Sequence, residues 1–74
     1  MKKLSVLIDA RHATSITLED EFETALKEIA RIQNRPINDI ISEIDRKRHH
    51  SNLSSAVRIY ILKFYQINSS KKIS

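Results

Sequence analysis

The fold is decided by residues 11–19, which are Arg11-His12-Ala13-Thr14-Ser15-Ile16-Thr17-Leu18-Glu19. Polar and apolar residues alternate from Thr14 onward, and this alternation predicts a half-buried β-strand. One side of the strand carries Thr14, Ile16 and Leu18, and the other carries Ala13, Ser15 and Thr17. A lone strand leaves its backbone N–H and C=O groups unpaired. Since the rest of the chain is patterned as helix, we expect the same strand of a second subunit to be its antiparallel partner.

Length and composition favour self-association and a polyanionic partner. A chain of 74 residues forms one domain with a small core. It contains no cysteine, so neither disulfides nor a thiolate metal site can stabilise it. Its 13 Lys and Arg residues exceed its 9 Asp and Glu residues, giving a net charge of +4. This balance favours nucleic acid as a partner.

The two ends of the chain are expected to be peripheral. Residues 1–10 are assigned as an N-terminal arm, either an extension of the ribbon, a separate arm on the core or a frayed end, with Lys2 and Lys3 beside the ribbon. The apolar run from Leu4 to Ile8 is about five residues, shorter than the roughly 7 to 15 of a signal peptide. No stretch has the length of a transmembrane helix. We therefore expect a cytoplasmic protein with no membrane contact, a domain at 11–67 and a flexible tail at 68–74.

A first helix is predicted directly after the strand. Thr17 and Asp20 have the spacing of a capping box. Helical spacing places Leu18, Phe22, Ala25, Leu26, Ile29 and Ala30 on one face. The acidic residues 19–21 and 23 suit the positive end of the helix dipole, and Asn34 is a suitable left-handed terminator.

Two further helices follow. Pro36 suits the start of the second, which has an apolar stripe of Ile37, Ile40, Ile41 and Ile44. Arg46, Lys47 and Arg48 form either a solvated last turn or a phosphate-binding patch. The third helix, from about Leu53 to Ile67 with Ser51 or Asn52 as its cap, is apolar on nearly every side, so we expect a second subunit to cover it. The predicted dimer core is Ile16, Leu18, Phe22, Leu26, Ile40, Ile41, Ile44, Val57, Tyr60, Ile61 and Phe64.

Enzymatic and metal-binding motifs are missing from the sequence. With no glycine, the chain has no phosphate-cradling loop or nucleophile elbow. His49 and His50 lack the helical spacing of zinc ligands, and His12 stands alone. We expect no enzyme activity and no cofactor.

Between residue 12 and about residue 66, a strand is followed by a helix that ends at an Asn and by a helix that starts at a Pro. In this order of elements the chain resembles the ribbon-helix-helix DNA-binding proteins of the Arc and MetJ type. The closest likeness is to a bacterial ribbon-helix-helix subgroup, and it rests on residues 12–19, Phe22, Leu26, Ile29-Ala30, Ile44-Asp45 and residues 52–58. Because residues 52–58 also resemble a second ribbon-helix-helix helix, either the middle or the last helix can fill that place. The expected fold is mostly α with one short strand, an intertwined homodimer with an intersubunit ribbon and a third helix.

The resemblance implies a homodimer that binds double-stranded DNA. It leaves open whether several dimers assemble on the DNA. Base contacts are implied for Ala13, Ser15 and Thr17; arginine is frequent in the subgroup where Ala13 stands, so Arg11 is included. Phosphate contacts are expected for Lys2 and Lys3 beside the groove. The resemblance also implies them for amides near Pro36, Ile37 and Asn38, because helix N-termini offer free N–H donors. The leading hypothesis is a repressor of transcription. The alternatives are an antitoxin, for which the tail after Phe64 is short, and a homodimeric interaction module that binds no DNA.

Overall fold

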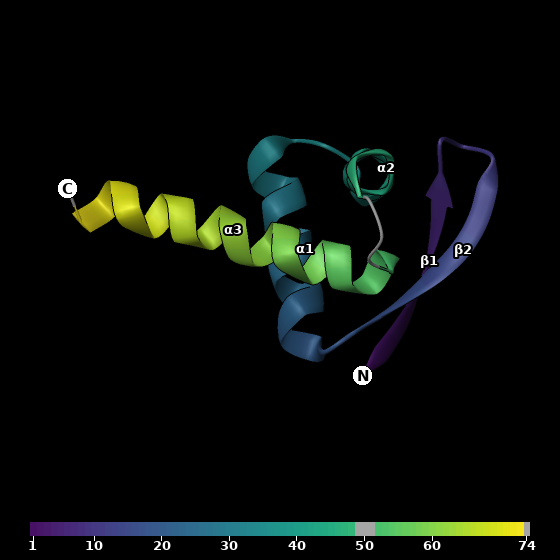
Figure 1. The fold of residues 1–74 in the computed structure, drawn as a ribbon, viewed down its shortest axis with the longest axis horizontal. Coiled ribbons are helices and arrows are strands. Elements are labelled where there is room, and N and C mark those ends of the chain that lie inside the picture. Colours follow the sequence, from purple (N-terminus) through teal and green to yellow (C-terminus); the bar gives the residue numbers. More distant parts are fainter. Residues whose placement is uncertain (49–51, 74) are drawn as a thin grey trace.

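The computed structural model describes residues 1–48 and 52–73 as an antiparallel sheet of two strands followed by three helices (Figure 1). The elements are β1 (Lys2–Ile8), β2 (His12–Leu18), α1 (Asp20–Gln33), α2 (Ile37–Lys47) and α3 (Leu53–Ile73). The predicted strand and the three predicted helices are confirmed. The interpretations placed on His49, His50 and Ser51 fall outside the described residues.

The partner of β2 is β1 of the same chain, which corrects the expectation that only a second copy could pair with it. The register joins Lys3 to Thr17, Ser5 to Ser15 and Leu7 to Ala13, with every residue of β2 opposite a residue of β1. Residues 1–10, expected as an arm, therefore supply a full strand. The inner face of this hairpin consists of Leu4, Val6, Ile8, Ile16 and Leu18, of which only Leu4 is not fully buried.

The hairpin turn is built without glycine. Asp9 and Ala10 both have positive φ, at 53° and 57°. The Arg11 N–H donates to the Ile8 carbonyl at 3.0 Å and closes the turn. Left-handed conformations at two successive residues match the twist of the paired strands, which is why such turns connect hairpins. Neither Asp9-Ala10 nor its flanks contains the Asn-Gly type of signal that announces this turn in a sequence.

The predicted boundaries of α1 are half right. Asn34 ends the helix in the left-handed conformation, at φ 54° and ψ 46°, as predicted. The capping box at Thr17 is wrong, since Glu19 is the N-cap and its side chain makes no capping hydrogen bond. Thr17 instead belongs to β2, where it is paired with Lys3 of β1, and its backbone is also bonded to side chains of α3.

The other two helices begin close to their predicted starts. Pro36 is the N-cap of α2, so the helix proper starts at Ile37. Asn52, one of the two predicted caps, caps α3, and its Oδ1 accepts the Ser55 N–H at 2.8 Å. The helix α3 continues past the predicted end at Ile67 to Ile73. Over the part of the chain that the structure describes, no helix is both long and apolar enough to cross a membrane.

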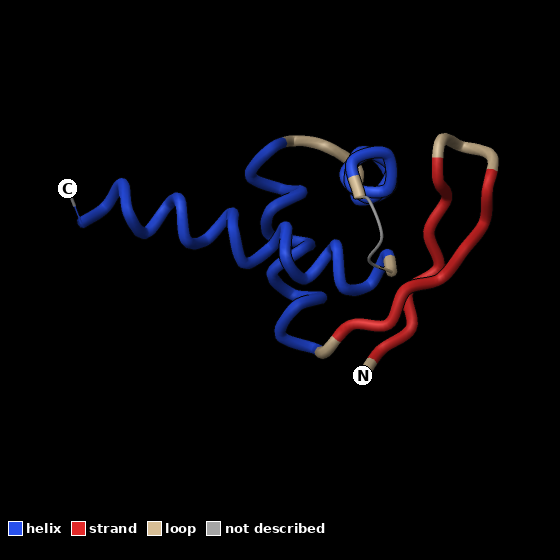
Figure 2. Tube along the Cα trace, in the orientation of Figure 1, coloured by secondary structure: helices blue, strands red, loops and turns tan. Residues whose placement is uncertain are grey.

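The hairpin lies on one side of the helices, and the C-terminal half of α3 extends away from them (Figure 2). α2 packs against β1, while the N-terminal part of α3 packs against β2 and the other helices. The core of a single chain already contains most of the residues predicted for the dimer interface: Ile16, Leu18, Leu26, Ile40, Ile41, Ile44, Val57 and Ile61 are buried, and Phe22, Tyr60 and Phe64 are half-buried against them. These residues therefore already pack together within one chain.

Candidate nucleic-acid interface

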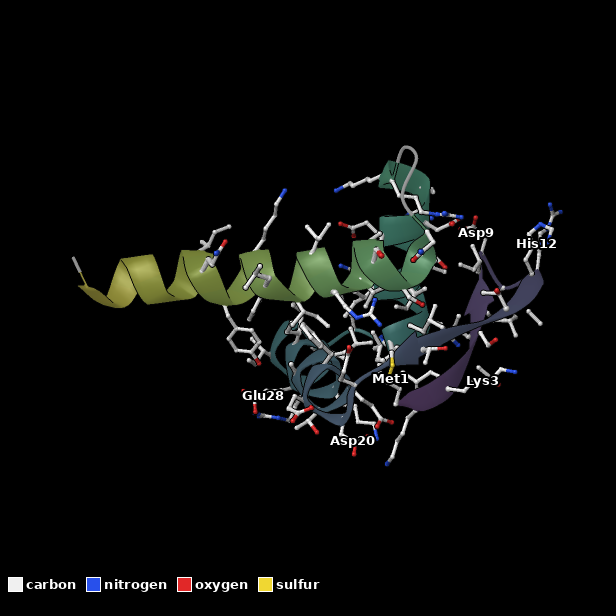
Figure 3. All side chains as sticks on the ribbon, turned by 60° about the horizontal axis from the view of Figure 1, so that its bottom comes forward. Met1, Lys3, Asp9, His12, Asp20 and Glu28 are labelled. Atoms are coloured by element: carbon white, nitrogen blue, oxygen red, sulfur yellow. The ribbon has the colours of Figure 1, made fainter. Side chains whose placement is uncertain are left out.

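The side of the hairpin that faces away from the helices is called the outer face here, and it consists of Lys3, Ser5, Leu7, Ala13, Ser15 and Thr17. All of these side chains are exposed. They offer hydroxyl, apolar and ammonium groups and no carboxylate. Lys3 points away from the helices (Figure 3). The outer face thus combines hydrogen-bonding groups with positive charge.

The structure confirms the pleat predicted for β2. Ile16 and Leu18 are 1% and 0% exposed. Ser15, which precedes Ile16, and Thr17, which lies between the two, are exposed. An extension of the ribbon was one of the alternatives left open for residues 1–10, but the pairing of β1 with β2, which supplies the other half of the same face, was not predicted. The alternation of Leu4, Val6 and Ile8 was the available signal, and exposed Leu7 between them obscured it.

Side chains of α2 and α3 hold the two free edges of the hairpin. On the β1 edge, the Leu7 N–H donates to Asn38 Oδ1 at 3.1 Å and the Asp9 N–H donates to Ser42 Oγ at 2.9 Å. On the β2 edge, the Thr17 N–H donates to Ser54 Oγ at 3.1 Å, and its carbonyl accepts from Arg58. These bonds fix the orientation of the outer face relative to the helices.

The start of α2 lies beside the outer face. Asn38 shares a shallow hollow with Ser5, Leu7 and Ser15. Pro36 and Asn38 are exposed, while Ile37 is half-buried. The structure therefore brings the predicted phosphate-binding amides next to β1, the strand that pairs with the predicted base-contacting strand β2, although the Asn38 side chain itself is used to hold Leu7.

The two N-terminal lysines lie on opposite faces of β1. Lys2 is paired in register with inward-facing Leu18, and its Nζ lies 3.6 Å from Glu23 Oε1. Within the described residues, Lys3 and Arg11 form no ion pair. Lys3 is on the outer face and Arg11 is exposed in the turn. These two cations are the ones on the hairpin that remain available to a ligand.

The basic end of α2 is neutralised within the chain. Arg46 Nη1 lies 2.8 Å from Asp9 Oδ1, and Lys47 Nζ lies 3.1 Å from Glu43 Oε2. Each of these four side chains has more than a quarter of its surface exposed. Arg48 Nε lies 2.8 Å from Asp45 Oδ1. These contacts favour the solvated-turn interpretation of residues 46–48 over the phosphate patch.

The shifted carboxyl groups serve structural ion pairs. The hydrogen bond from Arg58 lowers the pKa of Glu19, and hydrogen bonds from Lys47 and Arg35 lower the pKa of Glu43. Neither group lies on the outer face. Among the described residues, no cluster of three or more His, Asp or Glu side chains could hold a metal ion.

Comparison with known proteins agrees with this geometry. The family model described as "Ribbon-helix-helix domain" matches residues 1–65, which include both strands, α1, α2 and most of α3. No curated protein and no solved structure matches the chain. On the evidence of the family match and the fold, this chain belongs to the ribbon-helix-helix domain family.

Proposed function

We propose that this chain is a sequence-specific regulator of transcription in a bacterial cytoplasm, with repression as its expected role, and that it binds double-stranded DNA. Ribbon-helix-helix domains generally bind DNA and dimerise, and they are regulatory modules rather than enzymes. The observation that carries the proposal is the outer face, an exposed two-stranded ribbon free of carboxylates. A two-stranded ribbon fits the major groove of B-DNA.

Base contacts are proposed for the β2 residues of the outer face. The hydroxyls of Ser15 and Thr17 can donate to or accept from base edges, and the Ala13 methyl suits the methyl group of thymine. Arg11, exposed in the turn, is proposed to contact a base edge beyond the end of the strand. These assignments are supported by the exposure of all four side chains.

Phosphate contacts are proposed for Lys3 and for the backbone N–H groups of Ile37 and Asn38, which follow Pro36, a residue without an N–H of its own. A helix N-terminus offers N–H donors and partial positive charge to a phosphate. Asn38 lies beside Leu7 of the ribbon, so a duplex on the outer face would have its backbone near α2. Lys2 would have to leave Glu23 to reach a phosphate, so we propose it as the weaker contact.

The test is binding of the full chain to random duplex across a salt series, followed by fluorescence anisotropy. Each phosphate neutralised contributes about −0.9 to the slope of log K against log salt. We expect a steep slope for the wild type and a slope that is shallower by up to about one unit for Lys3→Gln. The matched control is Lys63→Gln on α3, which removes an exposed charge far from the ribbon. A flat salt response of the wild type would contradict the proposal.

The sequence-specific part of the proposal needs a second measurement. A preferred site is first obtained by selection from a random duplex library, and Ser15→Ala is then compared on that site and on random duplex. We expect Ser15→Ala to weaken binding to the selected site and to leave random-duplex affinity and salt slope unchanged. Equal losses on both duplexes would show that this position does not contact bases specifically.

A homodimer is part of the proposal, although the ribbon does not require one. The argument for a second copy is the general tendency of the family and the apolar surface left on α3, where Ile59 and Leu62 are 47% and 54% exposed. We expect Leu62→Glu to shift the chain toward monomer in sedimentation equilibrium and to leave its helical content by circular dichroism unchanged. An unchanged association state of this variant would contradict a dimer through α3.

The same apolar surface favours a second candidate function. An antitoxin, or an interaction module that binds no DNA, would use the exposed face of α3 for a protein partner. The salt series separates the candidates, because a purely protein-binding module lacks the steep slope that phosphate neutralisation produces.

A further inference from the structure

The hairpin register places β1 residues on the same exposed face as the proposed base contacts. Ser5 lies opposite Ser15, and Leu7 lies opposite Ala13. We propose that Ser5 and Leu7 determine sequence specificity together with the β2 residues, so that a single chain recognises an asymmetric DNA element. This inference rests on the proposed function, and it assigns base contacts to Ser5 and Leu7 of the N-terminal strand, for which the sequence predicted none.

The structure supports a ribbon completed within one chain. The inward residues Val6 and Ile8 of β1 are 4% and 6% exposed, so removing β1 from β2 would expose apolar side chains to water. β1 is also held from its other edge, through the hydrogen bonds of Asn38 and Ser42. A second copy of β2 would have to displace these contacts in order to take the place of β1.

The chemistry of Leu7 points to a base contact. Leu7 is 41% exposed, although its neighbours Val6 and Ile8 are buried. Together with Ala13 it forms an apolar pair at the end of the outer face nearest the turn. In the major groove the apolar group on a base edge is the thymine C5-methyl, so this end of the element is expected to prefer thymine.

Ser5 lies opposite Ser15 in the register, so this cross-strand row of the outer face carries two hydroxyl groups. Hydroxyls at both positions can bond to base edges on the two DNA strands. Because the Leu7 and Ala13 row is apolar and the Lys3 and Thr17 row is polar, the two ends of the face differ in chemistry. The element recognised by one chain is therefore not expected to be symmetric about the Ser5 and Ser15 row.

The first experiment is selection from a random duplex library with the full chain as wild type, Leu7→Thr, Ser5→Ala, Ser15→Ala and Lys63→Gln. We expect Leu7→Thr to reduce the preference for thymine at one end of the element by about fourfold or more, the factor that corresponds to one buried CH₂ group. Ser5→Ala should change the middle of the element, and Lys63→Gln should change nothing.

An element that Ser15→Ala alters and that Leu7→Thr and Ser5→Ala leave unchanged would overturn the inference while leaving the proposed function standing. If the wild type selects no element and shows a flat salt response, the proposed function fails first. Leu7→Thr places a β-branched residue, which suits a strand, at an exposed strand position, so its circular dichroism and melting temperature should match those of the wild type.

A second experiment tests the pairing itself and does not depend on DNA. The outward N–H groups of Leu7 and Thr17 show that odd-numbered residues form the non-hydrogen-bonded pairs of the hairpin, where Cα atoms approach to about 4.5 Å. That separation is within the range for a disulfide. The chain has no cysteine, so introduced thiols have no native competitor.

We expect the double variant Ser5→Cys and Ser15→Cys to form an intramolecular disulfide on mild oxidation, visible as a monomer on a non-reducing gel with no remaining free thiol. Ser15→Cys alone should keep its free thiol and remain monomeric on the same gel. A disulfide-linked dimer as the main product of Ser15→Cys alone would show β2 paired with β2 of a second copy and would overturn the inference.

Discussion

Arg58 of α3 donates from Nε to Glu19 Oε1 at 2.9 Å, and from Nη2 to the Thr17 carbonyl at 3.1 Å. One side chain thereby joins the third helix to the end of the ribbon and to the N-cap of α1. The guanidinium side chain is 27% exposed and that of Glu19 is 43% exposed, so water screens the pair in part. The contact links residues far apart in the sequence at the point where strand becomes helix.

This ion pair makes folding stability depend on pH. The Arg58 hydrogen bond holds the folded-state pKa of Glu19 below its ordinary value of 4.5. A carboxyl with a lowered pKa stabilises the folded chain above its unfolded value, and that contribution is lost as the pH falls through the folded value. We expect Glu19→Gln to lower the free energy of unfolding at pH 7 and to reduce its loss below about pH 5. Urea titrations at several pH values measure both effects.

The control for this prediction is Glu21→Gln, which neutralises an exposed carboxylate in the first turn of α1. Its stability should follow the wild-type dependence on pH. Parallel curves for the wild type and Glu19→Gln down to about pH 3 would contradict a stabilising role for the Arg58 contact.

Ala10 is expected to be replaceable by glycine with a gain in stability. Its φ of 57° costs an alanine roughly 1 kcal/mol, whereas glycine adopts this conformation freely. Ala10→Gly should therefore raise the free energy of unfolding by up to about 1 kcal/mol. The matched change Ala25→Gly, within α1, should lower it by a similar amount. A loss of stability for Ala10→Gly in chemical denaturation would contradict the left-handed turn.

Ile16→Asp should unfold the individual chain. Ile16 is 1% exposed in the core of one chain, and an unpaired carboxylate there would cost several kcal/mol, most of the stability of a small domain. Thr14→Asp, two residues earlier at an exposed position, should remain folded. Circular dichroism and sedimentation equilibrium distinguish the outcomes. A folded Ile16→Asp monomer would contradict the packing described here.

Ser42 and Asn38 should protect different backbone amides of the hairpin. Ser42 is 7% exposed and accepts the Asp9 N–H, so Ser42→Ala should cost about 1 kcal/mol and speed hydrogen exchange of the Asp9 amide. The Leu7 amide, held by Asn38, serves as the internal reference. Asn38→Ala should instead speed hydrogen exchange of the Leu7 amide and leave that of the Asp9 amide unchanged. Equal acceleration of both amides in either variant would indicate global opening instead of a local bond.

The sequence by itself determined the features that depend on near neighbours in the chain. The burial of Ile16 and Leu18 followed from the two-residue period of a strand. Asn34 ends α1 because asparagine tolerates the left-handed conformation, and Asn52 begins α3 because its side chain reaches an amide three residues on. Each of these depends on a few adjacent residues, so the pattern alone was sufficient.

Only the tertiary structure decided which strand pairs with β2. The turn at Asp9 and Ala10 contains no Asn-Gly or Asp-Gly pair, so the local sequence gave only a weak signal for a hairpin. The edges of the hairpin are completed by Asn38, Ser42 and Ser54, more than 30 residues away in the sequence. Sequence patterns specify which side of an element is buried, but the choice of partner depends on which distant groups the packed core brings within bonding distance.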